Sequence, residues 1–176
     1  AGTSISTVFI SGKMTTLESS VFADCDLLDV VYIPDNITRI KSSAFQGCES
    51  LKNLRLSQNI EVIEREAFRS IPIKSVNIPE SVEKIDGYAF ADCANLRFVT
   101  LPANIKSLDE GVFSGCRQLM NLTVKNITPP LVNANTFRGV NTDKCIISIP
   151  TAAYYGYIVA EYWGRFVQMR NDIAVQ

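Results

Sequence analysis

The chain has 176 residues, of which 17 are basic and 18 acidic, so its formal net charge is −1. With basic and acidic residues nearly equal in number, the chain lacks the excess of basic residues that a nucleic-acid-binding surface requires. No apolar run approaches the roughly 18 residues of a membrane span. The sequence has no histidine, which excludes histidine-dependent catalytic triads and histidine-bound metals. The first residues lack the charged and apolar regions of a signal peptide, and the length fits one domain over residues 1–176.

A short phrase centred on phenylalanine recurs along the chain. Segment 44–51 (AFQGCESL) returns as 89–96 (AFADCANL) and, with more variation, as 21–28 and 112–119. The aligned phenylalanines are separated by 23, 23, 22, 23 and 24 residues. They are Phe22, Phe45, Phe68, Phe90, Phe113 and Phe137. A period in the twenties predicts a solenoid, in which each repeat forms one coil that stacks on the next.

Each coil opens with a short strand. Val31 and Ile33 alternate with Val30 and Tyr32, which is the period of two expected for a strand, and Pro34 ends the ladder because it has no N–H to donate. Seven short parallel strands are predicted in this way, at 7–10, 30–33, 53–56, 75–78, 98–101, 121–124 and 146–149. At about 4.8 Å per step they form a sheet roughly 29 Å across.

The rest of each coil places apolar residues three apart, as Ile37 and Ile40 and then Phe45 and Cys48 do. This spacing predicts an irregular or 3-10 convex side, whose apolar residues one coil cannot bury alone. The third coil departs from the pattern, because 70–73 (SIPI) replaces the Gly-Cys segment and is one residue short. We interpret this departure as a tightened turn on the convex side.

The ends of the solenoid need cover, since a terminal coil exposes an apolar face and an open sheet edge. Repeats over 7–150 are expected to be followed by a cap over 151–176, in which Thr151 is the N-cap of a helix over 152–162. The apolar mass of this cap comes from Tyr154, Tyr155, Tyr157, Ile158, Tyr162 and Trp163. A ligand-binding aromatic box is the alternative. No cap is visible at the N-terminus, where either residues 1–6 or a preceding domain does this work.

Together these elements predict an α/β solenoid with a short-stranded parallel sheet, an irregular or 3-10 convex side and a C-terminal helical cap. The coil pattern, Leu-x-x-Val-x-Ile-Pro-x-x-Ile-x-x-Ile-x-x-x-Ala-Phe-x-Gly-Cys, resembles the BspA-like leucine-rich repeat family. Segments 128–130 (TPP), 135–140 (NTFRGV) and 162–166 (YWGRF) are similar to its usual tail. The resemblance implies a secreted or lipid-anchored surface protein of Gram-negative gut or oral anaerobes. Some relatives adhere to host matrix proteins or other cells, and the family offers no catalytic residues to carry over.

Four cysteines each follow a coil phenylalanine by three residues and are expected to form an inward ladder, namely Cys25, Cys48, Cys93 and Cys116. Parallel stacking would hold neighbouring Cβ atoms about 4.8 Å apart, which exceeds the usual Cβ separation within a disulfide. Buried free thiols are therefore favoured over disulfides. A metal site is not expected, because Ile71 divides the ladder and no Cys-x-x-Cys occurs. Cys145 is out of register and has no obvious partner.

Acidic residues gather at three places, where paired carboxylates could perform acid–base chemistry. These places are Asp24 with Asp26, the segment 61–66, and Asp109 with Glu110. Each lies in an expected turn beside lysine or arginine, so solvated turns are favoured over a catalytic pair.

The solvent side of the predicted sheet, its concave face, is the favoured binding surface. Strand alternation places on it Thr7, Phe9, Val30, Tyr32, Asn53, Arg55, Ser75, Asn77, Phe98, Thr100, Asn121, Thr123, Ile146 and Ser148. Two aromatics and a cation fall on consecutive rungs there; such residues anchor protein interfaces and stack on sugar rings. The structural alternative is that exposed aromatics simply favour strands. The candidate ligand-binding residues are Phe9, Tyr32, Arg55, Asn53, Asn77 and Phe98.

These observations predict an extracellular or cell-surface interaction module of the adhesion type, which binds a protein or a glycan on the solvent face of its sheet. The alternative is a structural spacer within a larger surface protein. No enzymatic activity, cofactor, metal or nucleic-acid partner is expected. The chain is expected to be a monomer, secreted or held at the outer membrane or cell surface of a Gram-negative bacterium, with a lipid anchor possible in a precursor.

Overall fold

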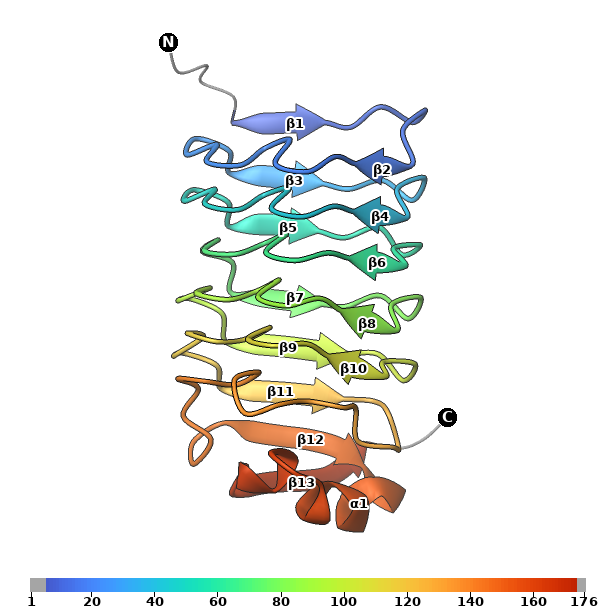
Figure 1. The fold of residues 1–176 in the computed structure, drawn as a ribbon, viewed down its shortest axis with the longest axis vertical. Helices are drawn as coiled ribbons and strands as arrows, with labels where there is room; N and C mark the ends of the chain where they lie inside the picture. Colours follow the sequence, from blue (N-terminus) through green and yellow to red (C-terminus); the bar gives the residue numbers. More distant parts are fainter. Residues whose placement is uncertain (1–5, 174–176) are drawn as a thin grey trace.

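The protein, in a computed structural model that describes residues 6–173, is a parallel β-solenoid of about seven turns. Figure 1 shows the coils stacked along one axis, with the first strand at one end and a short helical segment at the other. The suggestion that residues 1–6 cover the first coil falls, apart from Ser6, outside the described residues, as does the end of the chain at 174–176.

One side of the stack, here called the front, carries the strands that open each coil. They are β1 (Thr7–Phe9), β3 (Val30–Tyr32), β5 (Asn53–Arg55), β7 (Ser75–Asn77), β9 (Phe98–Leu101), β11 (Asn121–Val124) and β12 (Ile146–Pro150). Their bounds agree within one residue with the seven predicted strands, and every pairing between them is parallel. An eighth strand, β13 (Gln168–Ile173), extends the front beyond β12 and was not predicted.

The opposite side, here called the back, is a second parallel sheet rather than the irregular or 3-10 surface expected from the sequence. Its five strands are β2 (Thr16–Leu17), β4 (Arg39–Ile40), β6 (Val62–Ile63), β8 (Lys84–Ile85) and β10 (Ser107–Leu108). They pair without interruption from β2 to β10. Each has two residues, of which the second is buried, so the strands are too short for an alternating pattern to show in the sequence.

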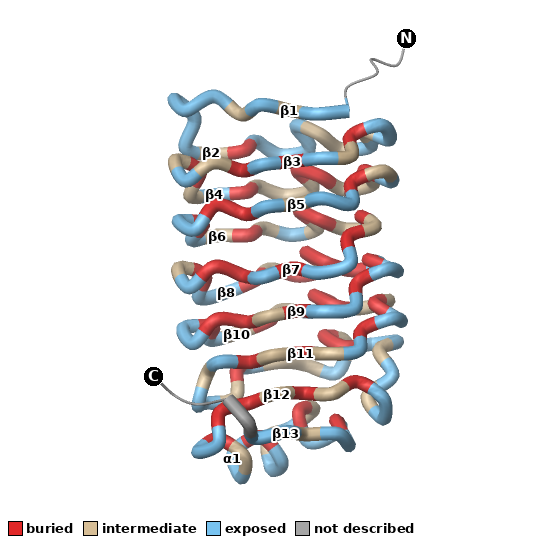
Figure 2. Tube along the Cα trace, turned by 180° about the vertical axis from the view of Figure 1, so that it is seen from behind, coloured by how far each residue is buried: buried red, intermediate tan, exposed pale blue. Residues whose placement is uncertain are grey.

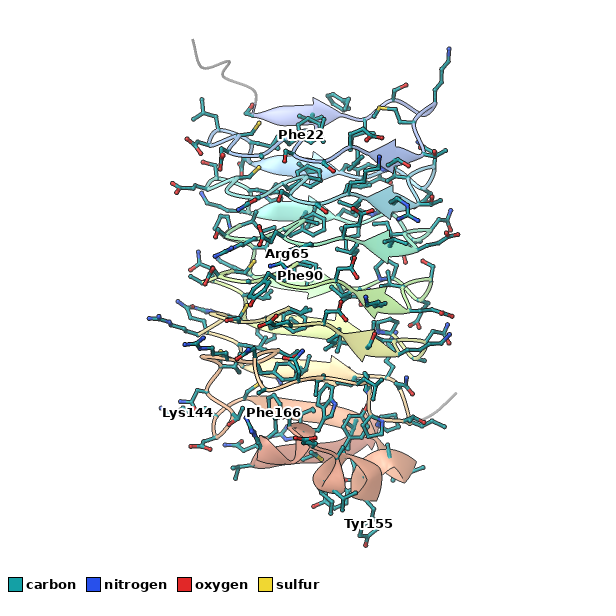
Figure 3. The ribbon with its side chains drawn as sticks, viewed as in Figure 1. Phe22, Arg65, Phe90, Lys144, Tyr155 and Phe166 are labelled. Carbon is teal, nitrogen blue, oxygen red and sulfur yellow. The ribbon has the colours of Figure 1, made fainter. Side chains whose placement is uncertain are left out.

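The six repeat phenylalanines form the predicted internal column. Neighbouring rings are stacked with centroids 5.2 to 6.0 Å apart, and Figure 3 places Phe22 and Phe90 within the stack. Only Phe22, in the first repeat, is half-buried; the other five are buried. In Figure 2 buried residues recur in each coil from β3 to β12, whereas β1 at the end of the stack is exposed or half-buried. The column is therefore the axis on which the coils superimpose.

Main-chain hydrogen bonds also join neighbouring coils along the segments that carry the phenylalanine column. Phe45 N–H donates to the carbonyl of Ala67 in the next coil at 2.8 Å. The position two residues after each phenylalanine is left-handed, as at Asp92 (φ 58°) and Gly115 (φ 77°). Asp92 N–H then donates to Ser114 at 2.7 Å. This conformation favours glycine and is tolerated by aspartate, which explains the residues found there at Gly47, Asp92 and Gly115.

Three cysteine thiols, those of Cys48, Cys93 and Cys116, each bond to the coil before their own. Cys48 Sγ donates to the Phe22 carbonyl at 3.0 Å, and Cys93 Sγ donates to the Phe68 carbonyl at 3.2 Å. All five cysteines are free, as favoured from the sequence. Burial raises the pKa of Cys48 to about 11 and that of Cys93 to about 12. Cys25 is half-buried rather than buried, because it lies in the first repeat.

The C-terminal segment is less helical than predicted. Instead of one helix over 152–162, it forms η1 (Thr151–Ala153), α1 (Tyr154–Val159) and η2 (Trp163–Arg165) before β13. Thr151 is not an N-cap, since its hydroxyl donates to the Asn171 carbonyl at 2.8 Å. The helix ends where Ala160 is extended and Tyr162 is left-handed. With one six-residue α-helix in the described chain, the fold is a parallel β-solenoid rather than an α/β structure.

This segment nevertheless packs on the last coil of the phenylalanine column. Trp163 and Phe166 contact the Phe137 ring edge-on, with centroids 5.3 and 5.2 Å away. Trp163 Nε1–H donates to the Pro130 carbonyl at 2.7 Å, and the buried Tyr157 hydroxyl donates to the Asn126 carbonyl at 2.9 Å. Of the six predicted cap residues, only Tyr157 and Trp163 are buried, and Tyr155 and Ile158 are exposed.

Candidate functional site

The predicted aromatic and cationic row exists on the front of the stack. Phe9 lies opposite Tyr32 in the ladder, and Tyr32 lies opposite Arg55. The Arg55 guanidinium stands over the Tyr32 ring, 4.9 Å from its centroid. Phe9 is 94% exposed and Tyr32 48% exposed, so both rings are open to a partner. An arginine stacked on an aromatic ring is already ordered for contact with a second planar or charged group.

The other three candidates lie further along the same face. Asn53 is exposed at the start of β5, two residues before Arg55, and Asn77 is exposed at the end of β7. Phe98 is 49% exposed and lies opposite Ser75 on one side and Asn121 on the other. The structure therefore brings Phe9, Tyr32 and Arg55 together, with Asn53 beside them, and leaves Asn77 and Phe98 on the far side of a break in the sheet.

That break lies between β5 and β7 and is here called the seam. The front strands form two separate sheets, one of β1, β3 and β5 and one from β7 to β13. Elsewhere on the front, the N–H that opens a strand donates to the coil before it, as Asn53 does to Asp29 at 3.2 Å and Phe98 to Lys74 at 3.2 Å. The corresponding bond from Ser75 to Lys52 is missing. The seam therefore has two open strand edges inside an otherwise continuous stack.

The far end of the seam lacks its hydrogen bond as well. In neighbouring coils the N–H that follows the strand donates to the next coil, as Ile33 does to Arg55 and Ile78 to Thr100, both at 2.9 Å. Leu56 makes no such bond to Asn77. A hollow of about 310 Å³ opens at this place. Its lining includes Leu54, Arg55, Leu56, Gln58, Ser75 and Asn77.

The short third coil is the cause of the seam. Its missing residue was interpreted from the sequence as a tightened convex turn, and the break in the front sheet that accompanies it was not predicted. The back strands stay in register, with Val62 opposite Lys84, and the Phe68 and Phe90 rings remain stacked at 5.2 Å. Since the back and the column both hold, the missing residue displaces the front strand that follows 70–73.

Exposed cations surround the seam. The residue before β5, β7 and β9 is Lys52, Lys74 and Arg97, and each is exposed. Arg55 adds a fourth cation on β5 itself. Within the described residues, none of these four forms an ion pair with a carboxylate. The matching position before β3 is Asp29, so the positive charge begins at the seam and continues toward β9.

Asp109 and Glu110, one of the three acidic groups noted in the sequence, have separate partners in the structure. Asp109 pairs with Lys84 at 2.8 Å, and the hydrogen bonds from Lys84 to Asp109 and Asp86 raise the pKa of this lysine to about 12. Glu110 accepts a hydrogen bond from Asn135 at 3.0 Å. These carboxylates border a hollow of about 550 Å³ next to Arg65. No group of three metal-ligating side chains occurs in the part of the chain that the structure describes.

A solenoid with one parallel front strand and one stacked phenylalanine per coil defines a leucine-rich repeat protein. Residues 15–142 match the BspA type leucine rich repeat region in six copies. The chain therefore belongs to this family, as its resemblance indicated. No curated protein matches the sequence.

Solved structures of bacterial leucine-rich repeat proteins share the fold. A T. pallidum leucine rich repeat protein is 23% identical over 84% of this chain and 70% of its own, with a TM-score of 0.71. A leucine rich cell surface protein from Faecalibacterium prausnitzii is 28% identical over 68% of this chain and 32% of its own (TM-score 0.66). The pneumococcal vaccine antigen PcpA is 19% identical over 98% of this chain and 42% of its own (TM-score 0.74).

The chain thus spans less than half the length of two of these three proteins. In residues 6–173, no helix is both long and apolar enough to cross a membrane. The repeat is a scaffold, and a scaffold does not specify a ligand.

Proposed function

We propose that this domain is a cell-surface interaction module that binds a protein or a glycan through the front of its solenoid. The observation that carries the proposal is the stacked pair of Tyr32 and Arg55, with Phe9 beside it, on an exposed face. Large aromatic and arginine side chains dominate the binding energy of protein interfaces. A soluble domain gains nothing for its own folding by leaving a phenylalanine ring 94% exposed, so a partner that covers Phe9 explains its position.

A cell-surface or secreted location is part of the proposal. It is supported by the F. prausnitzii neighbour, which is described as a cell surface protein. A Gram-negative host and a monomeric state remain predictions. One observation favours the spacer alternative. In two larger neighbours, the part that matches this chain makes up less than half of the protein.

The test begins with an array of glycans and matrix proteins, probed with the purified domain, and continues with titration of the ligand that it identifies. Tyr32→Ala and Arg55→Ala are expected to weaken binding by about thirtyfold each, since loss of an anchoring residue typically removes about 2 kcal/mol. Both side chains point away from the core, so the melting temperature should stay unchanged.

Two variants are matched controls for these substitutions. Tyr155→Ala removes a tyrosine that is 79% exposed at the C-terminal end of the stack, away from the front face (Figure 3). Arg117→Ala removes an exposed arginine from a turn. Both should bind as the unmodified domain does. If the Tyr32 and Arg55 variants also bind normally, the front row is not the site and the spacer alternative gains.

A further inference from the structure

We propose that the seam binds the main chain of an extended acidic peptide, which pairs with the open edges of β5 and β7. The inference rests on the proposed function and narrows its partner from a protein or glycan to a polypeptide segment. Three independent observations carry it: the unpaired main-chain groups, the hollow between them and the uncompensated cations around it.

The unpaired groups have the arrangement that a peptide strand recognises. The β5 edge presents the Lys52 carbonyl and the Leu56 N–H, and the β7 edge presents the Ser75 N–H and the Asn77 carbonyl. Each edge thus offers at least one acceptor and one donor. A peptide strand carries both kinds of group on each of its sides, and addition of a strand to an open sheet edge is a common mode of peptide recognition. A glycan has no regular alternation of donors and acceptors at this spacing.

The seam is also accessible without disruption of the fold. Ser75 and Asn77 are exposed, and the hollow of about 310 Å³ lies between the two edges. A strand that pairs with both edges needs about 9.6 Å between β5 and β7, twice the usual strand spacing of about 4.8 Å. The front edges therefore move apart to admit the peptide, while the back strands β6 and β8 stay paired behind them. Tyr32 and Arg55 are next to the seam and can contact the peptide side chains that point outward.

The charge around the seam selects the chemistry of the peptide. Lys52 and Lys74 precede its two strands, and Arg55 and Arg97 flank it. Opposite charge on a partner speeds its approach and fixes its register. Alternate side chains of a paired strand point to the same face. A peptide strand between β5 and β7 has one end beside Lys52 and Lys74 and passes Arg55 further along, so acidic residues on its outward face would meet these cations.

The probe is a fluorescein-labelled peptide of about six residues, a typical strand length, in which glutamate alternates with valine. We expect it to bind, and we expect amide hydrogen exchange at Ser75 and Leu56 to slow by about tenfold or more when it does. A lysine–valine peptide of equal length and the same glutamate–valine peptide N-methylated at alternate residues should both fail to bind. Binding of the N-methylated peptide at full affinity would overturn the inference, because its main chain cannot pair.

Variants of Ser75 isolate the main-chain contact. Ser75→Pro removes the N–H that has no partner in the free protein, and a proline is tolerated at a strand edge. It should leave the melting temperature unchanged and weaken the peptide about tenfold, the effect of one lost hydrogen bond. Ser75→Ala keeps the N–H and should bind normally. Asn121→Pro, which removes a bond to the Arg97 carbonyl, should lower the melting temperature. If Ser75→Pro lowers the melting temperature as much as Asn121→Pro does, the Ser75 N–H is hydrogen-bonded in the free protein and the inference is wrong.

Comparison with the front-row variants separates the two proposals. If Tyr32→Ala weakens the peptide and Ser75→Pro does not, the front face binds but the seam inference fails. If Ser75→Pro weakens it and neither Tyr32→Ala nor Arg55→Ala does, the seam is the site and the aromatic row is not. Slower exchange at Thr7–Phe9 alone would place the peptide on the outer edge of β1 instead. Binding of heparin, a sulfated glycan, with no change at Ser75 and Leu56 would also overturn the inference.

Discussion

Removal of one ring from the middle of the phenylalanine column tests the register of the whole solenoid. Phe90 has no exposed surface, and its ring lies 5.2 Å from Phe68 and 5.9 Å from Phe113. Truncation of a buried phenylalanine to alanine typically costs about 3–5 kcal/mol, which combines lost burial with the cavity that remains. Two aromatic contacts of about 0.5–1.5 kcal/mol each contribute to that total.

The cavity left by Phe90→Ala cannot collapse easily. Phe90 N–H donates to Val112 at 3.0 Å, and Ala89 accepts from Phe68 N–H at 2.8 Å, so the main chain is held from both neighbouring coils. Poor relaxation places the expected loss in the upper part of the range for this type of substitution. We therefore expect a decrease of about 4 kcal/mol in the free energy of unfolding.

Phe22→Ala is the matched comparison. Phe22 is half-buried and has one ring neighbour, Phe45, at 5.2 Å. Partial burial of a single large side chain supports a loss of only about 1–2 kcal/mol. Urea unfolding followed by circular dichroism measures both values. The reasoning is refuted if Phe90→Ala loses less than about 1 kcal/mol, or if the two variants lose the same amount.

The front strands and the column could be predicted because each rests on a local signal repeated in every coil. Val31 and Ile33 show the period of two, and the recurrence of Phe45 as Phe68 and Phe90 fixes the stacking register. The solenoid then follows from the length of the repeat. The candidate row of Phe9, Tyr32 and Arg55 followed as well, because the same register places alternate strand residues on one face.

The back sheet and β13 could not be predicted for a different reason. A strand of two residues such as Val62–Ile63 has no period, and its pairing depends on neighbours from other coils. β13 pairs with β12 after an intervening helical segment, and its sequence QMRNDI has only two apolar residues, with Asn171 at the position between them that would complete the alternation. Both elements are set by tertiary contacts rather than by local pattern.

The sequence shows the short third coil that accompanies the seam, but the break in the front sheet was not predicted from it. The length of the third coil shows that one residue is missing, although not which side of the coil absorbs the loss. The missing residue lies between Phe68 and β7, so the front strand is the element next to it. The Phe68 ring stays buried between two others, and the back strands pair continuously. The front sheet therefore divides while the back and the column continue.

Two further predictions concern the thiols. In native protein treated with iodoacetamide, mass spectrometry should find Cys48, Cys93 and Cys116 unlabelled until unfolding, and the half-buried Cys25 labelled first; labelling of all four at equal rates would contradict the ladder. Stability should also fall at alkaline pH, because burial raises the folded-state pKa of Cys48 to about 11 and of Cys93 to about 12, from an ordinary value of 9.0. A raised pKa favours the folded state fully below pH 9.0, and this contribution is lost as the pH rises through the folded values, since only unfolded chains release the proton in between. Lysines and tyrosines titrate in the same range, so the control is the Cys48→Ala/Cys93→Ala double variant, whose melting temperature should decline less steeply above pH 9.0. Parallel curves for the two proteins would show that the thiols are not shielded by the fold.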